Sequence, residues 1–235
     1  MPKLNGISII GKRPTILQLS YGVERANTYV IEEDGHAILI DACSKDVAKE
    51  LKKRNLSPDY LVLTHEHCDH LWGLNAIRSA FPNVQVVAQE YCNEAIGDPK
   101  RNKAKQYHIY ATMRFGESYQ NAEARNRTYS CAPAEIVFKD KLKLMWNGHE
   151  ITFRHTPGHS PGSMLIHIDD VGIFSGDSIL QEETFLKFDG GDEAAFNSIT
   201  LPIIIRIPDE TVVFPGHGEV FQMKEWRSNG RIAER

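Results

Sequence analysis

The sequence predicts a protein of the α/β class, built from layers of sheet and helix, and three observations lead to this prediction. Segments with strand character alternate with helical segments over the first third of the 235-residue chain. Strands return after Ile136. Hydrophobic residues make up 41% and charged residues 25%, which is the balance of a chain that folds around a core. A disordered, collagen-like or coiled-coil protein is therefore excluded.

The first third begins with a predicted hairpin. Residues 26–32 (ANTYVIE) and 36–42 (HAILIDA) are rich in Val, Ile and Tyr, and a turn over 33–35 (EDG) separates them. A helix capped by Ser44 and running to about Arg54 follows. A short apolar strand over 60–63, a helix over 71–80 and a strand over 84–88 come next. This order is typical of layered sheets and helices.

The second half contains four more predicted strands and one helix. The strands cover residues 151–155, 163–168, 171–175 and 211–214. The helix runs from Glu193 to Ile205, with Asp192 as its cap and a kink at Pro202. Neither a repeat nor a linker interrupts the pattern. A domain usually has about 150 residues, so we expect one large domain over residues 1–235.

Residues 98–135 differ from the rest in composition. Between Asp98 and Ser130 there are seven Lys or Arg against three acids, a local balance of +4. Five aromatic residues lie among them: Tyr107, Tyr110, Phe115, Tyr119 and Tyr129. Two interpretations have equal weight, a solvated helical cover with aromatic anchors or a lid over a substrate. The lid interpretation makes Tyr107, Tyr110 and Arg114 candidate substrate contacts, together with Lys187.

The charge and the cysteine content limit which binding partners and which cellular compartment we expect. The net charge of -4 and the pI of about 6.2 disfavour a dedicated nucleic-acid binder. No apolar stretch approaches the ~18 residues of a membrane span, and the N-terminal apolar run is too short for a signal peptide. We expect a cytoplasmic protein that binds neither nucleic acid nor membrane. The four cysteines form no CxxC pair, which favours free thiols. The oligomeric state is left open, a homodimer included.

The strongest chemical signal is the run of residues 65–70 (HEHCDH), which follows the apolar strand and precedes a helix. His65 and His67 are two positions apart, so an extended backbone points both side chains the same way. Asp69 and His70 follow where the chain turns, and can face the same point. Neutral imidazole and carboxylate are the usual ligands of zinc, iron and manganese. The run therefore predicts a metal site.

Three further ligand-type residues lie in glycine turns beside strands. They are His159 in TPGHSPG, Asp177 in SGDS and His217 in PGHG. Glycine lets a backbone approach an ion closely. Together with the first run they make seven potential ligands, enough for two adjacent ions that leave positions open for water.

In this order the motifs resemble the ligand pattern of the metallo-β-lactamase-fold hydrolases, and most closely their glyoxalase II-like (hydroxyacylglutathione hydrolase-like) branch. Residues 187–192 (KFDGGD), 197–199 and 224–229 also look like that branch, and the resemblance covers about residues 15–230. It implies a four-layer αββα sandwich that carries metals at one edge of its two sheets.

The resemblance also implies a role for each ligand. His65, His67 and His159 would hold the first of two divalent ions, and Asp69, His70 and His217 the second. Asp177 would bridge them, and Asp41 would orient a ligand by hydrogen bonding. Zinc is expected ahead of iron or manganese. Cys68 occupies a variable position and is not expected to be a ligand.

The ligand residues differ from those of several related branches, which narrows the choice of branch for this sequence. His67 stands where flavodiiron relatives have Glu, and Asp177 with His70 argues against the main class of true β-lactamases. The chain ends about 18 residues after His217, so the helical domain with which full-length glyoxalase II enzymes bind glutathione is not expected.

We therefore expect a hydrolase in which a metal-bridging hydroxide attacks a thioester, ester or lactone of a small acyl substrate, with Asp69 and Asp177 as catalytic carboxylates. One alternative is an oxidoreductase similar to persulfide dioxygenases, with one iron on His65, His159 and Asp177. A nuclease of the same fold and a binding scaffold without activity are weaker alternatives.

Overall fold

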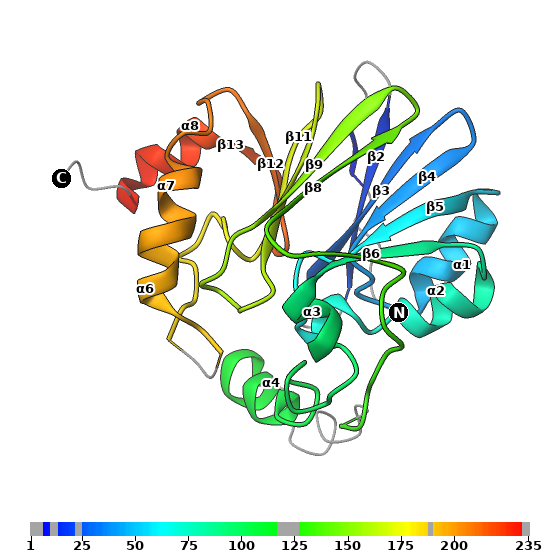
Figure 1. Cartoon of the computed structure of the whole chain (residues 1–235), viewed down its shortest axis with the longest axis horizontal. Coiled ribbons are helices and arrows are strands. Elements are labelled where there is room, and N and C mark those ends of the chain that lie inside the picture. The colour runs from blue at the N-terminus through cyan, green and yellow to red at the C-terminus, as the bar shows by residue number, and fades with distance from the viewer. Residues whose placement is uncertain (1–6, 10–13, 22–24, 117–126, 188–189, 232–235) are drawn as a thin grey trace. The chain divides into compact units, whose positions relative to one another are not determined.

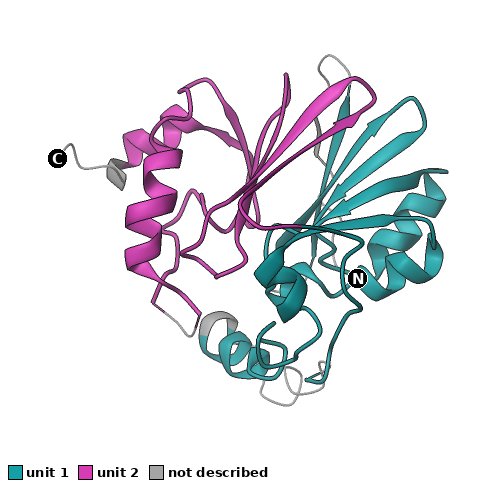
Figure 2. Ribbon diagram, in the orientation of Figure 1, with its two compact units in different colours: residues 1–137 teal, residues 138–235 magenta. Residues whose placement is uncertain are grey.

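The computed structural model describes residues 7–9, 14–21, 25–116, 127–187 and 190–231, and its chain packs as two compact units, residues 1–137 and 138–235 (Figure 2). Each unit contains one β-sheet with helices (Figure 1). The expectation of a single domain stays a prediction. Asp189, in the segment that resembles the glyoxalase II-like branch, lies outside the described residues. None of the described helices is long and apolar enough to cross a membrane.

The sheet of the first unit is mixed. Its strand order follows the sequence from β1 to β7, antiparallel from β1 to β4 and parallel from β4 to β6. The strands are β1 (Ile7–Ile9), β2 (Thr15–Tyr21), β3 (Ala26–Glu33), β4 (His36–Ile40), β5 (Ser57–Val62), β6 (Gln85–Gln89) and β7 (Ile136–Phe138). The helices are α1 (Asp46–Lys53), the short 3₁₀-helix η1 (Cys68–His70), α2 (Leu74–Ala80), α3 (Glu90–Ala95) and α4 (Tyr107–Phe115).

The predicted hairpin is confirmed as β3 and β4. Its two turn residues, Asp34 and Gly35, both have positive φ, 52° and 85°, as a two-residue hairpin turn requires. The helix predicted after Ser44 is α1, which begins one residue later than a Ser44 cap implies, because Lys45 occupies the cap position. The Ser44 hydroxyl still accepts a hydrogen bond from the Asp46 amide, at 3.2 Å.

The core of the first unit lies between this sheet and α1 and α2. Val47 and Leu51 of α1 and Ile77 of α2 pack on Leu39 and Leu61 of the sheet. The second helix begins at Leu74 and not at 71 as predicted, because the 3₁₀-helix comes first. Burial on this face holds the loop after β5, which contains the predicted ligands, against the sheet.

The second unit has a mixed sheet in the order β13-β12-β11-β10-β9-β8, in which only β11 and β12 are parallel among the pairs described. The strands are β8 (Lys141–Trp146), β9 (His149–His155), β10 (Met164–Ile168), β11 (Gly172–Gly176), β12 (Val212–Pro215) and β13 (Phe221–Gln222). The helices are α6 (Glu193–Ala195), the π-helix η2 (Phe196–Thr200), α7 (Leu201–Ile204), α8 (Met223–Trp226) and the π-helix η3 (Arg227–Arg231).

The single helix predicted from Glu193 to Ile205 is a run of three segments. Asp192 caps it as predicted, accepting a hydrogen bond from the Ala195 amide at 2.9 Å. The middle segment is a π-helix that ends just before Pro202, which has no N–H to continue an α-helical ladder. Ile204, Met223 and Trp226 pack on the sheet at Leu165 and Val213 and form the core of this unit.

Candidate metal centre

The first unit contributes the HEHCDH loop, which follows β5. The amide of Leu63 donates to the Val87 carbonyl at 3.0 Å, so the chain leaves the sheet only after that residue. The ring centroid of His65 lies 4.6 Å from that of His67 and 4.3 Å from that of His70. All three imidazoles are buried, whereas the side chain of Asp69 is 13% exposed. Four ligand-type groups are thus gathered at one strand end.

Asp41, which directly follows β4, holds this loop through hydrogen bonds. Its carboxylate is 1% exposed and accepts three hydrogen bonds: from the Thr64 amide at 2.7 Å, the Thr64 hydroxyl at 2.7 Å and His70 Nδ1 at 2.8 Å. A positive φ of 60° at Asp41 turns the side chain toward the loop. The family resemblance implies that Asp41 orients a ligand by hydrogen bonding, and this contact with His70 is what such a role needs.

The same network selects the tautomers of two histidines. A carboxylate can only accept, so His70 donates from Nδ1 and its Nε2 is the nitrogen with a lone pair. The Thr64 hydroxyl donates its proton to Asp41, so it accepts from His65 Nδ1, which lies 3.0 Å away. His65 therefore also presents an unprotonated Nε2. Neutral imidazole with Nδ1 held by an oxygen is the usual state of a metal-binding histidine.

The second unit contributes His159, Asp177 and His217. His159 lies in the turn between β9 and β10, Asp177 directly follows β11 and His217 follows β12. Because β11 and β12 are parallel, their carboxyl ends lie at the same edge, where the Gly216 amide donates to the Gly176 carbonyl at 2.8 Å. His159 and His217 place Nε2 at 3.6 and 3.5 Å from Oδ2 of Asp177. His159 Nδ1 lies 3.1 Å from the Phe185 carbonyl, to which it can only donate.

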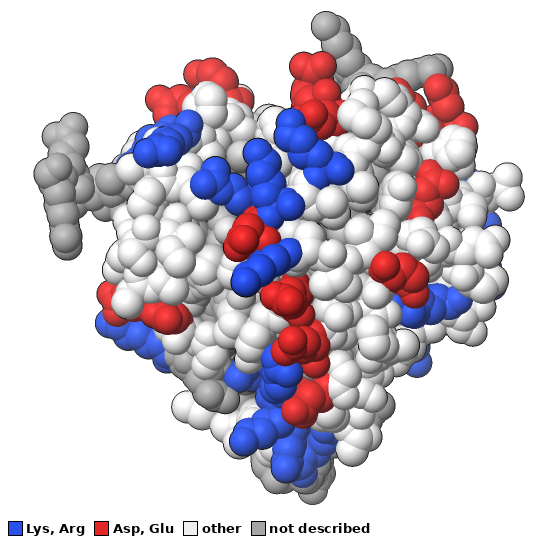
Figure 3. Space-filling view, viewed as in Figure 1, with Lys and Arg blue, Asp and Glu red and all other residues white. Residues whose placement is uncertain are grey.

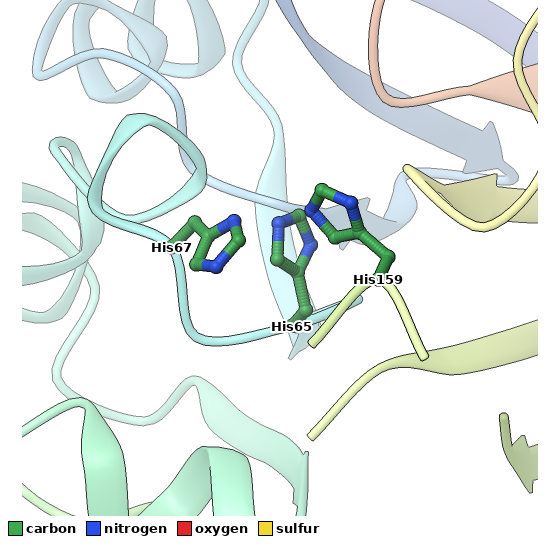
Figure 4. Close-up of side chains that lie close together, drawn as sticks. All are labelled: His65, His67 and His159. Atoms are coloured by element: carbon green, nitrogen blue, oxygen red, sulfur yellow. The ribbon is translucent and has the colours of Figure 1, made fainter. Parts of the chain in front are cut away.

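Within each unit, the ligand-type groups have the spacing of ligands around an ion. Two ligand atoms at ~2.0–2.1 Å from a tetrahedral metal are about 3.3 Å apart. His70 Nε2 lies 3.7 Å from Asp69 Oδ2 in the first unit, and the contacts of Asp177 in the second measure 3.5 and 3.6 Å. These distances are longer than a good hydrogen bond. Figure 4 draws His65 and His67 on the loop of the first unit and His159 on the turn of the second.

The four cysteines are free thiols, as predicted from the sequence, and the structure buries all four. Burial raises the pKa of the Cys43 thiol to about 11. Its Sγ donates to the Asn27 carbonyl at 3.0 Å. Cys68 is 1% exposed and its side chain belongs to the core cluster of the first unit.

The structure distinguishes the predicted substrate contacts from one another. Tyr107 is 4% exposed and its ring stands edge-on to Trp72 at 5.6 Å, which is a packing position. Tyr110 is 44% exposed on the same helix, and Lys187 is exposed. Arg114 lies in α4, but its side chain is outside the described residues. Figure 3 shows Lys and Arg side chains gathered near α4, with acidic side chains beside them. Arg101, which precedes α4 in the sequence, pairs with Glu94 at 3.1 Å.

Three residues that contact the loop of residues 65–70, called the ligand loop below, were not predicted from the sequence. Thr64 joins Asp41 to His65, as described above. Asn102 and Tyr129, from the segment over 98–135, bond the backbone of Cys68 and of Leu71. The adjacency of Thr64 to the HEHCDH run was a usable signal. Asn102 and Tyr129 are far from the run in sequence and belong to no motif, so only the fold places them here.

Comparison with known proteins agrees with this geometry. A model of the Metallo-beta-lactamase superfamily matches residues 21–217. A probable metallo-hydrolase of Streptococcus pyogenes is 30% identical over 199 residues, which cover 82% of this chain and 78% of that protein. A hydroxyacylglutathione hydrolase of Bartonella tribocorum is 24% identical over 188 residues, which cover 79% of this chain and 59% of that protein.

Three solved structures share the fold. The BLEG-1 B3 metallo-β-lactamase has 25% identity and a TM-score of 0.73, covering 91% of this chain and 96% of its own. ETHE1 from Myxococcus xanthus has 21% identity and a TM-score of 0.67, with 92% and 83% covered. TTHA1623, in a di-iron-bound form, has 20% identity and a TM-score of 0.66, with 92% and 98% covered. The predicted αββα fold class is confirmed. The glyoxalase II-like branch stays a prediction.

Proposed function

Because the chain belongs to the metallo-β-lactamase superfamily, we propose that this metallo-hydrolase carries two divalent ions and cleaves a thioester, ester or lactone of a small acyl substrate. The observation that supports this most is the hydrogen-bond network of Asp41 and Thr64. It binds Nδ1 of His65 and of His70, which makes Nε2 of each ring the nitrogen that would bind a metal. Imidazoles held in this way suit metal binding better than a structural role.

In this proposal the two halves form one site. His65, His67 and His159 would hold the first ion, Asp69, His70 and His217 the second, and Asp177 would bridge them. Within the first unit, the proposal is supported by the proximity of His65 to His67, of His65 to His70 and of Asp69 to His70. The association of the two units into one site is part of the proposal and follows from the family resemblance.

Two ions bound here would lower the pKa of a shared water toward neutrality and polarise the substrate carbonyl. The protein's own residues would do the positioning. Asp41 fixes the orientation of the His70 ring through Nδ1, and the Phe185 carbonyl does the same for His159. The carboxylates of Asp69 and Asp177 are acceptors, so they can orient the attacking water by taking its hydrogen bonds.

Zinc is the first candidate metal because imidazole and carboxylate ligands suit it. Iron is the second, because the same ligand types also bind iron and a protein of this fold has been solved with two irons. Manganese is the third. Localisation in the cytoplasm, absence of nucleic-acid and membrane partners, and an open oligomeric state with a homodimer included remain predictions.

A mononuclear oxidoreductase similar to persulfide dioxygenases is the second candidate function. It would need one iron on His65, His159 and Asp177 only. The fold of this chain is similar to that of ETHE1 from Myxococcus xanthus, which is the reason to include this candidate in the test. The other four ligand-type residues would then have no role at the metal, which is why the dinuclear hydrolase ranks first.

Metal analysis combined with a substrate panel tests the proposal. Protein purified without chelator should contain about two ions per chain. It should hydrolyse at least one of a set of thioesters, esters and lactones, but not a phosphodiester. One iron per chain together with oxygen consumption on a persulfide would favour the oxidoreductase, and cleavage of the phosphodiester would favour the nuclease.

Asp177 gives the sharpest variant. Asp177→Asn should lower the metal content and reduce the rate about 100-fold or more, because it removes a bridging charge. The control is Asp170→Asn, a turn position of the same unit with φ of 58° that asparagine tolerates. An Asp177→Asn protein with full metal and full rate would show that the ligand assignment is wrong.

A further inference from the structure

Asn102 lies in the segment over residues 98–135 and every polar group it has is used. The residue is fully buried. Its side-chain amide donates to the Ile96 carbonyl at 3.1 Å and to the Tyr129 carbonyl at 2.9 Å, and its side-chain oxygen accepts from the Ala104 amide at 3.0 Å. Its backbone amide donates to the Asp98 carbonyl at 2.9 Å. These contacts hold the residue in one orientation.

The remaining group, the Asn102 carbonyl, reaches the ligand loop. It accepts a hydrogen bond from the Cys68 amide at 2.8 Å. Cys68 stands between His67 and Asp69, so this bond fixes the peptide in the middle of the ligand run. The side-chain hydrogen bonds of Asn102 described above go to Ile96, Tyr129 and Ala104 and not to a candidate ligand. Asn102 acts by fixing its own carbonyl, and through that carbonyl the loop.

Tyr129 adds a second anchor from the same segment. Its hydroxyl donates to the Leu71 carbonyl at 2.5 Å, and its ring stands edge-on to Trp72 at 4.9 Å. Its own carbonyl accepts from Asn102, so the two anchors are connected. The loop is also held by the chain that follows β4, where the Ala42 amide donates to the His70 carbonyl at 2.9 Å. The loop is therefore fixed by two parts of the chain, the residues that follow β4 and the segment over 98–135.

We propose that Asn102 is a positioning residue of the metal centre, which sets the geometry of His67 and Asp69 through the amide of Cys68. The inference rests on the proposed metal-dependent function. No other side chain of similar size supplies two donors and one acceptor in this arrangement. Aspartate loses both donors and places a buried charge against two carbonyls. Alanine removes the bonds to the Tyr129 carbonyl and the Ala104 amide, whereas the Ile96 carbonyl keeps its bond from the Cys131 amide at 3.0 Å.

The test uses the full chain loaded with Co²⁺, whose visible absorption reports ligand geometry. We expect Asn102→Asp and Asn102→Ala to shift this spectrum and to weaken metal binding 10–100-fold in competition with a chelator, the usual effect of losing a residue that supports a ligand. The matched control is Asn93→Ala. Asn93 accepts from the Ala134 amide at 2.7 Å and so fastens the far end of the same segment, without a described bond to the loop. It should lower the melting temperature and leave spectrum and affinity unchanged.

A third variant keeps the inference testable if the Asn102 proteins fail to fold. Tyr129→Phe keeps the ring and removes the hydroxyl, which bonds the Leu71 carbonyl and also Cys131 and the backbone at Asn75. It should shift the Co²⁺ spectrum by a smaller amount. Folded variants with wild-type spectrum and affinity would overturn the inference. An equal spectral change in Asn93→Ala would overturn it too, because the effect would then be general loosening. If the wild type binds two ions but hydrolyses nothing, only the proposed reaction fails. If the wild type binds no metal, both fail.

Discussion

The Asp41–His70 pair is the residue-scale feature that distinguishes this protein from one with merely clustered histidines. A surface pair of the same composition, His36 with Asp59, has nearly the same distance of 3.0 Å, but its side chains are 56% and 36% exposed. The buried pair at 2.8 Å is 0% and 1% exposed. Because an unsatisfied buried group is costly and an exposed one is not, only the buried pair is expected to have large energetic effects.

The first prediction compares these two pairs. Asp41→Asn should reduce the free energy of unfolding by about 3 kcal/mol, because one amide oxygen cannot replace a carboxylate that accepts three hydrogen bonds. It should also weaken metal binding roughly 10–100-fold. Asp59→Asn should change stability by less than about 0.5 kcal/mol and leave metal binding intact. Urea unfolding and chelator competition measure both effects. Equal effects of the two substitutions would contradict the argument.

At the scale of single elements, the turn that contains His159 depends on Gly158. Its φ is +141°, and an added Cβ would lie 2.5 Å from Cβ of Phe196 in the π-helix. The turn and the helix therefore approach more closely than any side chain permits, and the position of His159 depends on that approach. The Asp192 amide donates to the Gly158 carbonyl at 2.8 Å and holds the two segments together.

Gly158→Ala should therefore destabilise the protein by more than about 2 kcal/mol and also weaken metal binding through His159. Gly148→Ala is the control. Gly148 also has a positive φ, +87°, but nothing lies within 4 Å of its added Cβ. It should show the backbone strain of about 1 kcal/mol alone, with normal metal binding. Chemical unfolding of both variants separates the cost of backbone strain from the cost of the contact with Phe196. Equal losses would mean that contact with Phe196 does not matter.

The helix α4 presents two tyrosines with different roles. Tyr107→Ala should reduce the free energy of unfolding by about 3 kcal/mol, because a buried ring against Trp72 is lost. Tyr110→Ala should change stability by less than about 0.5 kcal/mol and raise KM severalfold with little change in kcat, if α4 contacts the substrate.

The control for Tyr110 is Ile205→Ala, which truncates an apolar residue that is also about half exposed, at 47%, in the second unit. Steady-state kinetics on the best substrate of the panel should show no change in KM for this variant. An unchanged KM for Tyr110→Ala and Arg114→Ala would return residues 98–135 to the interpretation of a solvated cover.

At the scale of the whole molecule, the buried thiols set an alkaline limit to stability. Burial raises the pKa of Cys43 and of Cys131 to about 11, from an ordinary value of 9.0. Above pH 9 the unfolded chain releases thiol protons that the native protein keeps, so the unfolded state binds fewer protons and stability falls as pH rises. Below pH 9 the contribution is complete. Each thiol accounts for up to about 3 kcal/mol between pH 9 and 11.

Urea unfolding at pH 8, 9, 10 and 11 should show this decline, starting near pH 9. Burial also raises the pKa of Tyr129, which adds to the decline above pH 10. Cys131→Ala should make the decline shallower without moving its onset, because Cys43 still titrates. A free energy of unfolding that is constant from pH 8 to 11 would contradict the assignment of these thiols as protonated in the native state.

The sequence alone determined the α/β class, most of the strands and the ligand-type residues, because these depend on local patterns. The hairpin at Asp34 and Gly35 needs only a turn that accepts positive φ, and the HEHCDH run needs only a strand end. The run over 193–205 was predicted as one kinked helix. Its division into α and π segments depends on Pro202 and on the contact between Gly158 and Phe196, which are not adjacent in sequence.

The tertiary structure decided which residues support the candidate ligands. Asp41 bonds His70 across 29 positions and Thr64 across 23, and the Asn102 carbonyl reaches Cys68 from a segment with no motif. Tyr107 and Tyr110 look alike in sequence, but packing against Trp72 buries one of them only. The types of the candidate ligands follow directly from the residue types in the sequence. Their orientation depends on long-range hydrogen bonds and burial, which exist only after folding brings distant residues together.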